Sequence, residues 1–509
     1  MARRGGAGRV TVGVVAGLMA SSLTLLAPST GSAGAAAAAT NGASPYGTTV
    51  PSPVCIPRRT PVPSGPATFV RQSTVPNTGG RVLDIVLDAP AMNGPTHIDV
   101  LLPRGYDPSG ATRYPVLYLL HGAGGSYRDW VGQGVESDID YTSVADGLRP
   151  FITVMPDGGA WGYYSDWYGT DIGQASSTPP PAYATYDIDE LIPWIDGHFP
   201  TVATRAGRAI AGLSMGGFGA MSLAAQNPDL FTAAGSFSGA VDTDIDYPIG
   251  GAALNLLSSA FTHGLPSQCV WGDPVTQGVL WHGADPTYLA SNLSNTWLFV
   301  ASGNGKPGIY DTPGTAATAV DGGIESFVYS MNQNFIGALD AAHISYNKYF
   351  YGNGTHSWGY WLRDLAHFLP EMEFAFVTTS PSLGGMPFTY RTIHQSFTEF
   401  GYAFSVRHPA AAFTYLNGVT SAGLSVTGTG DLSVVTPATY VPGGSYLVSI
   451  ATSGSGHPGT SRLTERADPS GKLAFTVDLG GPNSVQQTSF ANPPASFGRA
   501  QVTISTGPG

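Results

Sequence analysis

The sequence predicts an α/β fold with a doubly wound, mostly parallel sheet, followed by an all-β C-terminal region. Residues 114–120 and 152–155 are continuous apolar runs, which fit strands buried on both faces of a parallel sheet. Such runs alternate with helical patterns up to about residue 378, as in doubly wound sheets. From residue 388 onward the helical periodicity is lost. Short β-rich runs separated by Gly, Pro, Ser and Asn clusters there predict a small sandwich.

The individual elements follow from the same patterns. Two early runs, 82–87 and 97–102, alternate apolar and polar residues as half-buried antiparallel strands do. Further strands of the sheet are expected at 209–211, 233–237, 297–301 and 346–350. Helices are expected at 188–199, 216–226 and 323–342. The strands of the C-terminal region are expected within 397–406, 423–426, 445–450 and 473–477.

The first residues have the layout of a secretory signal peptide. Arg3, Arg4 and Arg9 form a positive start, residues 10–26 are apolar, and a small-residue run suited to cleavage begins at Ser32. The alternative is an uncleaved anchor helix, but the Gly and Ser residues inside the apolar stretch favour cleavage. No later stretch approaches the roughly 18 apolar residues of a spanning helix. We therefore expect a secreted or cell-envelope protein with no integral membrane segment after signal cleavage.

The predicted organisation has four parts. Residues 1–39 are the signal peptide, and residues 40–66 are a Pro/Ser-rich linker or arm. Residues 67–378 are expected to form the α/β domain, and residues 386–509 an accessory β-sandwich domain.

Composition and charge exclude several function classes. Hydrophobic residues make up 42% of the 509 residues and charged residues 11%, which describes a globular chain. The formal net charge of −12 is unlike the basic footprint of a nucleic-acid-binding protein and provides no attraction to anionic lipid head groups. Export would place Cys55 and Cys269 in a compartment that permits a disulfide, with two unpaired thiols as the alternative.

A candidate nucleophile lies in the motif Gly212-Leu213-Ser214-Met215-Gly216. In a chain with 68 glycines the pentapeptide alone is weak evidence, because a chance match is expected. Its context is more specific, because the motif follows the short apolar strand at 209–211 and opens a helix rich in small residues. This strand–turn–helix arrangement is the nucleophile elbow of α/β-hydrolases, which exposes a serine hydroxyl. The alternative is a Gly-rich turn with a structural serine.

An ester-cleaving serine needs hydrogen-bond donors for the oxyanion that develops on the carbonyl. One should be the backbone N–H of Met215, the residue after the nucleophile. The second should come from the loop after an early strand, and residues 114–120 lead directly into His121-Gly122-Ala123-Gly124-Gly125. We expect the Ala123 N–H to be this donor, with Gly124 next. His121 is interpreted as a residue that shapes the loop, not as the base.

The base and the acid should follow the later strands. His356 lies in the loop after the strand at 346–350, and it follows the serine in chain order as this fold requires. The acid that orients the imidazole is harder to choose. No carboxylate directly follows the strand at 297–301, and the residues alone leave Asp311, Asp321 and Glu325 as nearly equal candidates.

Several segments together resemble a known family. In order along residues 80–370 they are Tyr164-Ser165-Asp166-Trp167-Tyr168, Gly212-Leu213-Ser214-Met215, Ala284-Asp285-Pro286, Gly303-Asn304-Gly305 and the long run from Asn353 to Trp361. This set resembles the esterase D family of serine α/β-hydrolases and, within it, the antigen 85 mycolyltransferases. The resemblance implies that Glu325 is the acid of a Ser-His-Glu triad, with Asp311 in reserve. It also implies Met215 and Ala123 as oxyanion donors.

The chain departs from the antigen 85 pattern in two places. Those proteins carry Asp where this chain has His121, whereas formylglutathione hydrolases and feruloyl esterases of the wider family have His-Gly there. They also lack the C-terminal β region. Both differences argue against a mycolate substrate.

The expected function is an exported serine carboxylic-ester hydrolase or acyltransferase that works through an acyl-enzyme on Ser214, with envelope lipid or sugar esters as substrates. One alternative is a mycolyl- or diacylglycerol-type acyltransferase with a sugar or glycerol acceptor in place of water. Another is a non-catalytic envelope binding protein on a hydrolase fold, with a cell-envelope glycan as a partner. Five residues are candidate substrate contacts, with ordinary packing as the alternative for each: Arg128, Trp130, Asp166, Trp167 and Trp358.

We expect neither a cofactor nor a metal. Asp242, Asp244 and Asp246 alternate along the chain, but the Gly and distal Glu of a calcium-binding loop are missing.

Overall fold

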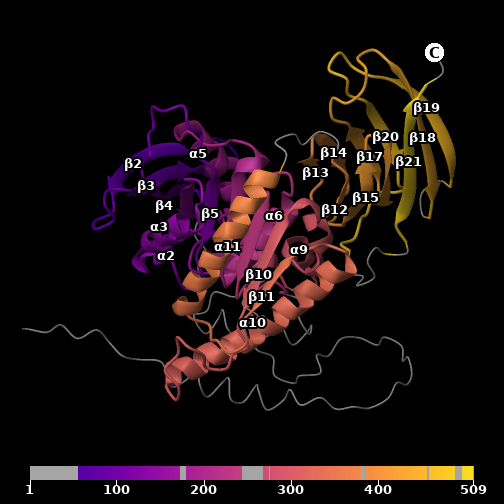
Figure 1. Cartoon of the computed structure of the whole chain (residues 1–509). Helices are drawn as coiled ribbons and strands as arrows, with labels where there is room; N and C mark the ends of the chain where they lie inside the picture. The colour runs from indigo at the N-terminus through magenta and orange to yellow at the C-terminus, as the bar shows by residue number, and fades with distance from the viewer. Residues whose placement is uncertain are drawn as a thin grey trace, which may run out of the picture.

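The structure is a computed structural model that describes residues 55–171, 179–243, 268–273, 276–379, 386–454, 458–487, 494 and 496–507. We name two parts of the described chain: residues 55–379 are the hydrolase region, after the α/β-hydrolase fold predicted from the sequence, and residues 386–507 are the C-terminal β region. Figure 1 shows the first in indigo to orange and the second in orange to yellow. The predicted signal peptide, the start of the predicted arm, and Asp244 and Asp246 lie outside the described residues.

The centre of the hydrolase region is a nine-stranded mixed sheet with the strand order β11-β10-β9-β8-β5-β6-β4-β3-β2. Its six parallel strands are β5 (Val116–Leu120), β6 (Ile152–Pro156), β8 (Arg208–Leu213), β9 (Ala233–Phe237), β10 (Trp297–Ser302) and β11 (Asn347–Phe350). The antiparallel edge consists of β2 (Thr68–Thr74), β3 (Val82–Ala89) and β4 (Gly94–Leu101). The parallel strands β5, β6, β8 and β9 are buried at every residue, as their continuous apolar runs predict.

Helices cover both faces of this sheet. On one face, strand residues such as Tyr118 and Ile210 share a core with α5 (Ile192–His198), α6 (Met215–Gln226) and α10 (Ala316–Ala341). On the other face, their neighbours Leu119 and Ala211 share a core with α3 (Val135–Asp146) and α11 (Trp358–Thr378). Successive side chains of a strand point to opposite faces, so one apolar run supplies both cores. The predicted doubly wound α/β fold is therefore confirmed.

Shorter elements complete the hydrolase region. They are β1 (Cys55–Pro57), η1 (Pro90–Met92), α2 (Asp129–Gly132), β7 (Gly169–Asp171), α4 (Tyr183–Thr185), η4 (Arg205–Gly207), α8 (Gln268–Trp271), α9 (Gly278–Ala284) and η5 (Ala290–Asn295). The helix predicted at 188–199 differs in detail, because it begins with a π-helical segment, η3 (Tyr186–Leu191), before the α-helical turns of α5.

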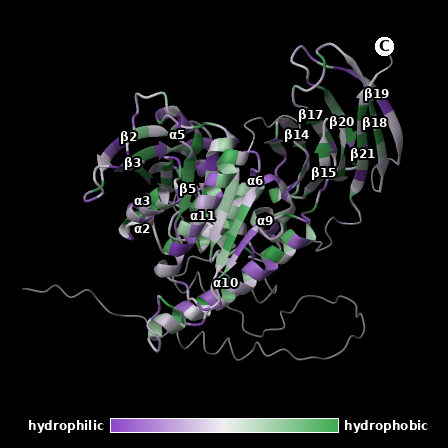
Figure 2. Cartoon of the chain, viewed as in Figure 1, coloured by the Kyte–Doolittle hydropathy of each residue, from purple (hydrophilic) through white to green (hydrophobic). Residues whose placement is uncertain are grey.

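The C-terminal β region consists of two antiparallel sheets. The larger has the order β12 (Phe388–Thr392), β15 (Thr414–Thr420), β16 (Gly423–Gly428), β21 (Gly498–Thr506), β18 (Ser445–Ser453) and β19 (Gly459–Arg466). The smaller has the order β13 (Ser396–Glu399), β14 (Tyr402–Val406), β17 (Asp431–Val435) and β20 (Ala474–Asp478). Buried and exposed residues alternate along β17 and β20, as in strands with one face on a core. Figure 2 shows hydrophobic residues along the inner strands of both regions.

Direct hydrogen bonds join the two regions. The Tyr390 hydroxyl donates to the carbonyl oxygen of Gln226 at 2.6 Å, and the Phe400 N–H donates to Asp229 Oδ2 at 3.2 Å. The side chain of Asn292 accepts from the backbone N–H of Arg391 and donates to its carbonyl oxygen, each at 2.9 Å. Strand β12 is therefore held against the end of α6 and against η5.

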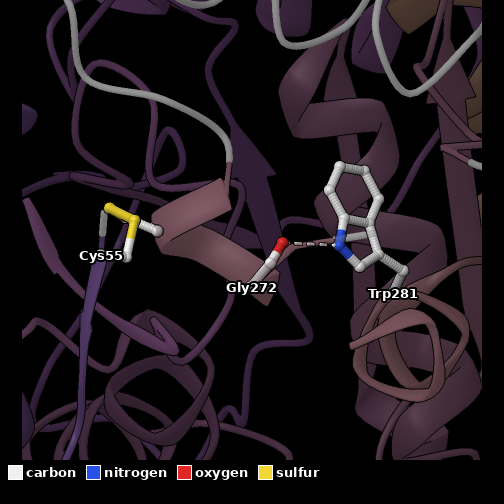
Figure 3. The surroundings of a disulfide bond; sticks show 4 residues. Cys55, Gly272 and Trp281 are labelled. Atoms are coloured by element: carbon white, nitrogen blue, oxygen red, sulfur yellow. Dashed lines mark hydrogen bonds between the residues drawn. A yellow bond between two sulfur atoms is a disulfide. The ribbon is translucent and has the colours of Figure 1, made fainter. Parts of the chain in front are cut away.

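A disulfide links Cys55 of β1 to Cys269 of α8, with a Cα–Cα distance of 5.4 Å (Figure 3). The pairing expected from the sequence is therefore present. Beside it, the Trp281 indole N–H donates to the Gly272 carbonyl oxygen at 3.0 Å. Strand β1 pairs in antiparallel fashion with β7, so the bond and the small sheet together fix the start of the described chain. Among the described residues, no helix combines the length and the apolar character that crossing a bilayer requires.

Candidate active site

Ser214 occupies the sharp turn between β8 and α6. Its backbone has φ 53° and ψ −118°, a conformation that non-glycine residues rarely adopt. The flanking glycines have a clear steric reason. A Cβ on Gly216 would lie 2.4 Å from the Leu120 carbonyl oxygen, and one on Gly212 would lie 2.5 Å from the backbone of Gly216. The turn can therefore form only with glycine at both positions.

Ser214, His356 and Glu325 form one chain of hydrogen bonds. His356 Nε2 lies 2.8 Å from Ser214 Oγ, and His356 Nδ1 lies 2.8 Å from Glu325 Oε2. The Glu325 side chain is fully buried, and the His356 side chain is 8% exposed. The serine is half-buried at the start of α6. In this arrangement the imidazole can take the serine proton while the carboxylate holds the ring and stabilises the charge it gains.

Three donors from the ends of neighbouring strands hold the second oxygen of Glu325. The Ser238 hydroxyl, the Ser302 hydroxyl and the Gly303 N–H donate to Oε1 at 2.8, 2.9 and 2.7 Å. Ser238 directly follows β9 and has a left-handed backbone with φ 49°. Neither serine was predicted from the sequence. The available signal was their position, since each lies at the carboxyl end of a parallel strand, where such sheets place their sites.

The two other candidate acids have different contacts. Asp311 accepts hydrogen bonds from the hydroxyl of Thr355, from the Gly308 N–H at 2.7 Å and from the Tyr360 hydroxyl at 2.7 Å. The backbone carbonyl oxygen of Asp321 accepts a hydrogen bond from the backbone N–H of His356 at 3.2 Å. Among the described residues, neither carboxylate has a hydrogen bond to the imidazole of His356. The Asp311 carboxylate and the Asp321 backbone instead contact the loop that carries the histidine.

The predicted oxyanion donors lie on the two segments that meet at Ser214. Met215 is the first residue of α6, so its N–H has no acceptor within the helix. The loop that carries Ala123 approaches the serine closely, because a Cβ on Gly122 would lie 3.5 Å from Ser214 Cβ. The Gly124 N–H donates to the Ala160 carbonyl oxygen at 2.6 Å. This bond leaves Ala123 as the better donor of the two loop candidates.

His121 is buried and bonded at both ring nitrogens. Its Nε2 accepts the Gly158 N–H at 2.9 Å, and its Nδ1 lies 2.8 Å from the Gly122 carbonyl oxygen. Because Nε2 accepts, the proton of the neutral ring is on Nδ1. These contacts are those of a residue that shapes the loop.

The predicted substrate contacts differ in how far a ligand can reach them. Trp130 is fully buried, and its indole N–H donates to the Leu120 carbonyl oxygen at 3.0 Å. A substrate cannot touch it in this structure, so it belongs to the support beneath the loop and not to a pocket. Trp358 is half-buried beside His356 and packs edge-on against Trp130, with ring centroids 5.2 Å apart.

The remaining three have internal partners. Asp166 accepts from the Thr185 N–H at 2.9 Å and from its hydroxyl at 2.7 Å. The Trp167 indole N–H donates to the Gly162 carbonyl oxygen at 3.2 Å. Arg128 is 38% exposed and donates to Asp84 Oδ2 at 2.6 Å. Arg128 therefore keeps a partly exposed charged group in the loop that follows Ala123.

A buried carboxyl group lies beside Arg128. Asp99 is fully buried, and its Oδ2 is 3.6 Å from Arg128 Nε. Burial raises the pKa of Asp99 to about 7, although the guanidinium acts in the opposite direction. Within the described ranges, no group of His, Cys, Asp and Glu side chains is arranged to hold a metal ion.

Comparison with known proteins identifies the family. A family model described as putative esterase matches residues 89–372, more than half of the chain. The chain belongs to this esterase family. It is 34% identical over 271 residues to the diacylglycerol acyltransferase/mycolyltransferase Ag85B of Mycobacterium leprae, which covers 52% of this chain and 77% of that protein. The resemblance to the esterase and antigen 85 family is thus confirmed.

Other relatives match over a smaller part. The chain is 36% identical over 208 residues to the esterase Rv1288 of Mycobacterium tuberculosis, which covers 40% of this chain and 42% of that protein. The chain therefore spans less than half the length of this esterase relative. Among solved structures, the Mycobacterium tuberculosis protein MPT51 (FbpC1) has a TM-score of 0.46 at 23% identity, covering 60% of this chain and 99% of that chain.

Proposed function

We propose that this protein is an exported serine hydrolase or acyltransferase that acts on carboxylic esters, with Ser214, His356 and Glu325 as its catalytic triad. The observation that carries the proposal is the continuous hydrogen-bond chain from Ser214 Oγ through the imidazole to Glu325. The strained turn at Ser214 supports it, because such strain persists where function requires it. This complete set argues against a non-catalytic binding protein on the same fold.

The proposed reaction has two halves. His356 Nε2 takes the Ser214 proton as Oγ attacks the ester carbonyl, and the N–H groups of Met215 and Ala123 stabilise the resulting oxyanion. The intermediate collapses when the C–O bond to the leaving alcohol breaks, and His356 returns the proton to that alcohol. An acyl-enzyme on Ser214 remains. His356 then deprotonates water or an acceptor hydroxyl, which attacks the acyl carbonyl and releases Ser214.

The substrate class and the acceptor are proposed from the relatives. The relative Ag85B is a diacylglycerol acyltransferase/mycolyltransferase. For the present chain we propose lipid or sugar esters of the cell envelope, with Arg128 and Trp358 as contacts. Water is the proposed acyl acceptor. A sugar or glycerol acceptor is the alternative. The disulfide supports export, because such bonds persist in oxidising compartments.

A fluorophosphonate probe tests the proposal. We expect the wild-type protein to be labelled on Ser214 and to hydrolyse p-nitrophenyl esters, and we expect Ser214→Ala to lose both properties while keeping its Tm. Ser222→Ala is a matched control, since Ser222 lies on the same helix but faces the Ala284 carbonyl oxygen. A folded wild type that is neither labelled nor active would refute the proposal. Products formed with glycerol or trehalose present would then separate transfer from hydrolysis.

A further inference from the structure

A cavity lies at the junction between the hydrolase region and the C-terminal β region. Its volume is about 620 Å³, within the range of small-molecule sites. The hydrolase region contributes Asp242, the segment between α9 and η5, residues of η5 and the end of α10, and the β region contributes residues of β12 and β15. Nine of its thirteen lining residues are polar, and they include Asp242, Asp285, Tyr288, Ser291, Arg391 and Asn417.

The cavity is separate from the catalytic triad. Ala338, which lines it, lies thirteen residues beyond Glu325 on α10. At the rise of an α-helix this separation is about 20 Å. None of the triad residues lines the cavity. A ligand bound here would therefore not contact the reacting ester.

Arg391 provides the donors on one wall. The Asn292 side chain bonds both the backbone N–H and the carbonyl oxygen of Arg391. The Arg391 Nε donates to Ser291 Oγ at 3.0 Å. The guanidinium lies 5.4 Å from the ring centroid of Tyr288, so the group is held in place by stacking. Its two terminal nitrogens have no acceptor among the described residues, and no carboxylate there pairs with it. These N–H groups remain available to a ligand.

Carboxyl groups that line the same cavity provide hydrogen-bond acceptors. Asp285 is buried and accepts from the Tyr288 N–H at 2.7 Å and from the Thr243 hydroxyl at 2.8 Å. Asp242 accepts from Asn334 Nδ2 at 2.7 Å. Burial and the neighbouring Asp242 raise the pKa of Asp285 to about 7. The cavity thus combines one fixed cation with carboxyl oxygens.

A strip of small apolar residues completes the lining. Ala290, Ala338, Ala341 and Ala342 contribute methyl groups and no large apolar side chain. Such a strip suits the C–H face of a sugar ring, whereas an acyl chain would meet the polar walls. An anion would satisfy Arg391 but would lie close to two carboxyl groups. Sugar hydroxyls both donate and accept, so they can bond Arg391 and the carboxyl oxygens together.

We propose that this junction cavity is a non-catalytic binding site for a neutral sugar, and that both regions of the chain contribute to it. The site goes beyond the proposed ester chemistry and does not depend on it. Its ligand class is a neutral mono- or disaccharide unit, free or as part of a glycan. The expected consequence is that the enzyme is retained on glycan material while its triad remains free for esters.

The test uses the full-length protein and isothermal titration with cellobiose, maltose and trehalose as neutral probes, and with galacturonic acid and inorganic phosphate as anionic probes. Ala341→Trp fills the cavity from an exposed helix position. We expect at least one neutral disaccharide to bind the wild type. Its affinity should fall at least tenfold in Ala341→Trp. Gln333→Trp is the matched control, because it adds the same side chain at an exposed α10 position outside the cavity lining.

A second variant covers the case in which Ala341→Trp does not fold. Arg391→Gln removes the guanidinium donors, and we expect the same loss of sugar binding with hydrolysis of a small soluble ester kept within twofold of wild type. Three results would each overturn the proposal: no binding of any neutral probe, equal binding by the wild type and both variants, or binding of the anionic probes alone. Because sugar binding is read separately from ester turnover, an inactive protein that binds sugar would refute only the proposed esterase function.

Discussion

The hydrolase region and the C-terminal β region are both built on well-buried strands, but they differ in where non-glycine residues adopt a strained backbone with positive φ. Among the described residues, the non-glycine positions with positive φ in the hydrolase region include Ser214 and Ser238 at the candidate site. In the β region the same set contains Phe400 alone. Strain in such positions costs on the order of 1–3 kcal/mol each, and it persists where surrounding structure enforces it. The hydrolase region therefore places strained positions at the candidate site, whereas the β region has one strained non-glycine position among its described residues.

Glu325→Gln, in the hydrolase region, should have the largest effect of the substitutions considered. The amide cannot stabilise the imidazolium that forms during attack, and we expect kcat to fall by roughly 10³–10⁴-fold. The measurement is ester hydrolysis by purified protein with its Tm recorded. Asp311→Asn is the control and should lower kcat by about tenfold at most, the equivalent of one weakened hydrogen bond. If Asp311→Asn had the larger effect, the acid would be misassigned.

Leu432→Ala tests the C-terminal β region, which has fewer strained backbone positions. Leu432 is fully buried in the core of the β region, on β17. The lost methyl groups and the cavity left behind should lower the free energy of unfolding by ~2–5 kcal/mol. We expect ester turnover by the folded fraction to stay unchanged. Ser433→Ala, at an exposed position of the same strand, should change neither quantity. A loss of turnover in folded Leu432→Ala would mean that the two regions are mechanically coupled.

Glu399→Gln gives the smallest effect and tests the contact between the regions. Burial and the neighbouring Asp229 raise the pKa of Glu399 well above its usual value. The folded state therefore keeps a proton that the unfolded chain releases, so the stability from this group is present below about pH 4.5 and is lost as pH rises through the folded pKa. Between pH 5 and pH 8 the wild-type Tm should fall by at least ~2 °C relative to Glu399→Gln. Parallel Tm curves for the two proteins would contradict this expectation.

The sequence predicted the elements of the fold better than the contacts between them. The pattern of apolar residues located the strands of the sheet, because that pattern within each strand reflects which of its side chains are buried. It did not predict the π-helical start of the helix at 186–198, since a π turn depends on what packs against the helix. The boundaries of the four predicted parts stay a prediction.

The candidate site shows the same division. The elbow at Ser214 and the loop at His356 are local patterns, so the residues alone identified both. Glu325 required a family resemblance, because its choice over Asp311 depends on Ser238, Ser302 and Gly303, which meet only in the folded chain. Trp130 was expected near a substrate, yet its burial depends on a neighbouring helix and strand that the local sequence does not reveal.

The disulfide divides the proposed triad along the chain. Cys55 and Cys269 enclose 214 positions of sequence separation, and Ser214 with its proposed oxyanion donors lies inside that loop. Glu325 and His356 lie outside it. Under the proposed export, oxidation can therefore close the loop once residue 269 has left the translocation channel, before either partner of the serine has emerged. The nascent chain would then be covalently closed around the proposed nucleophile before its partners arrive, so the proposed ester chemistry would begin only after the second half of the hydrolase region has folded.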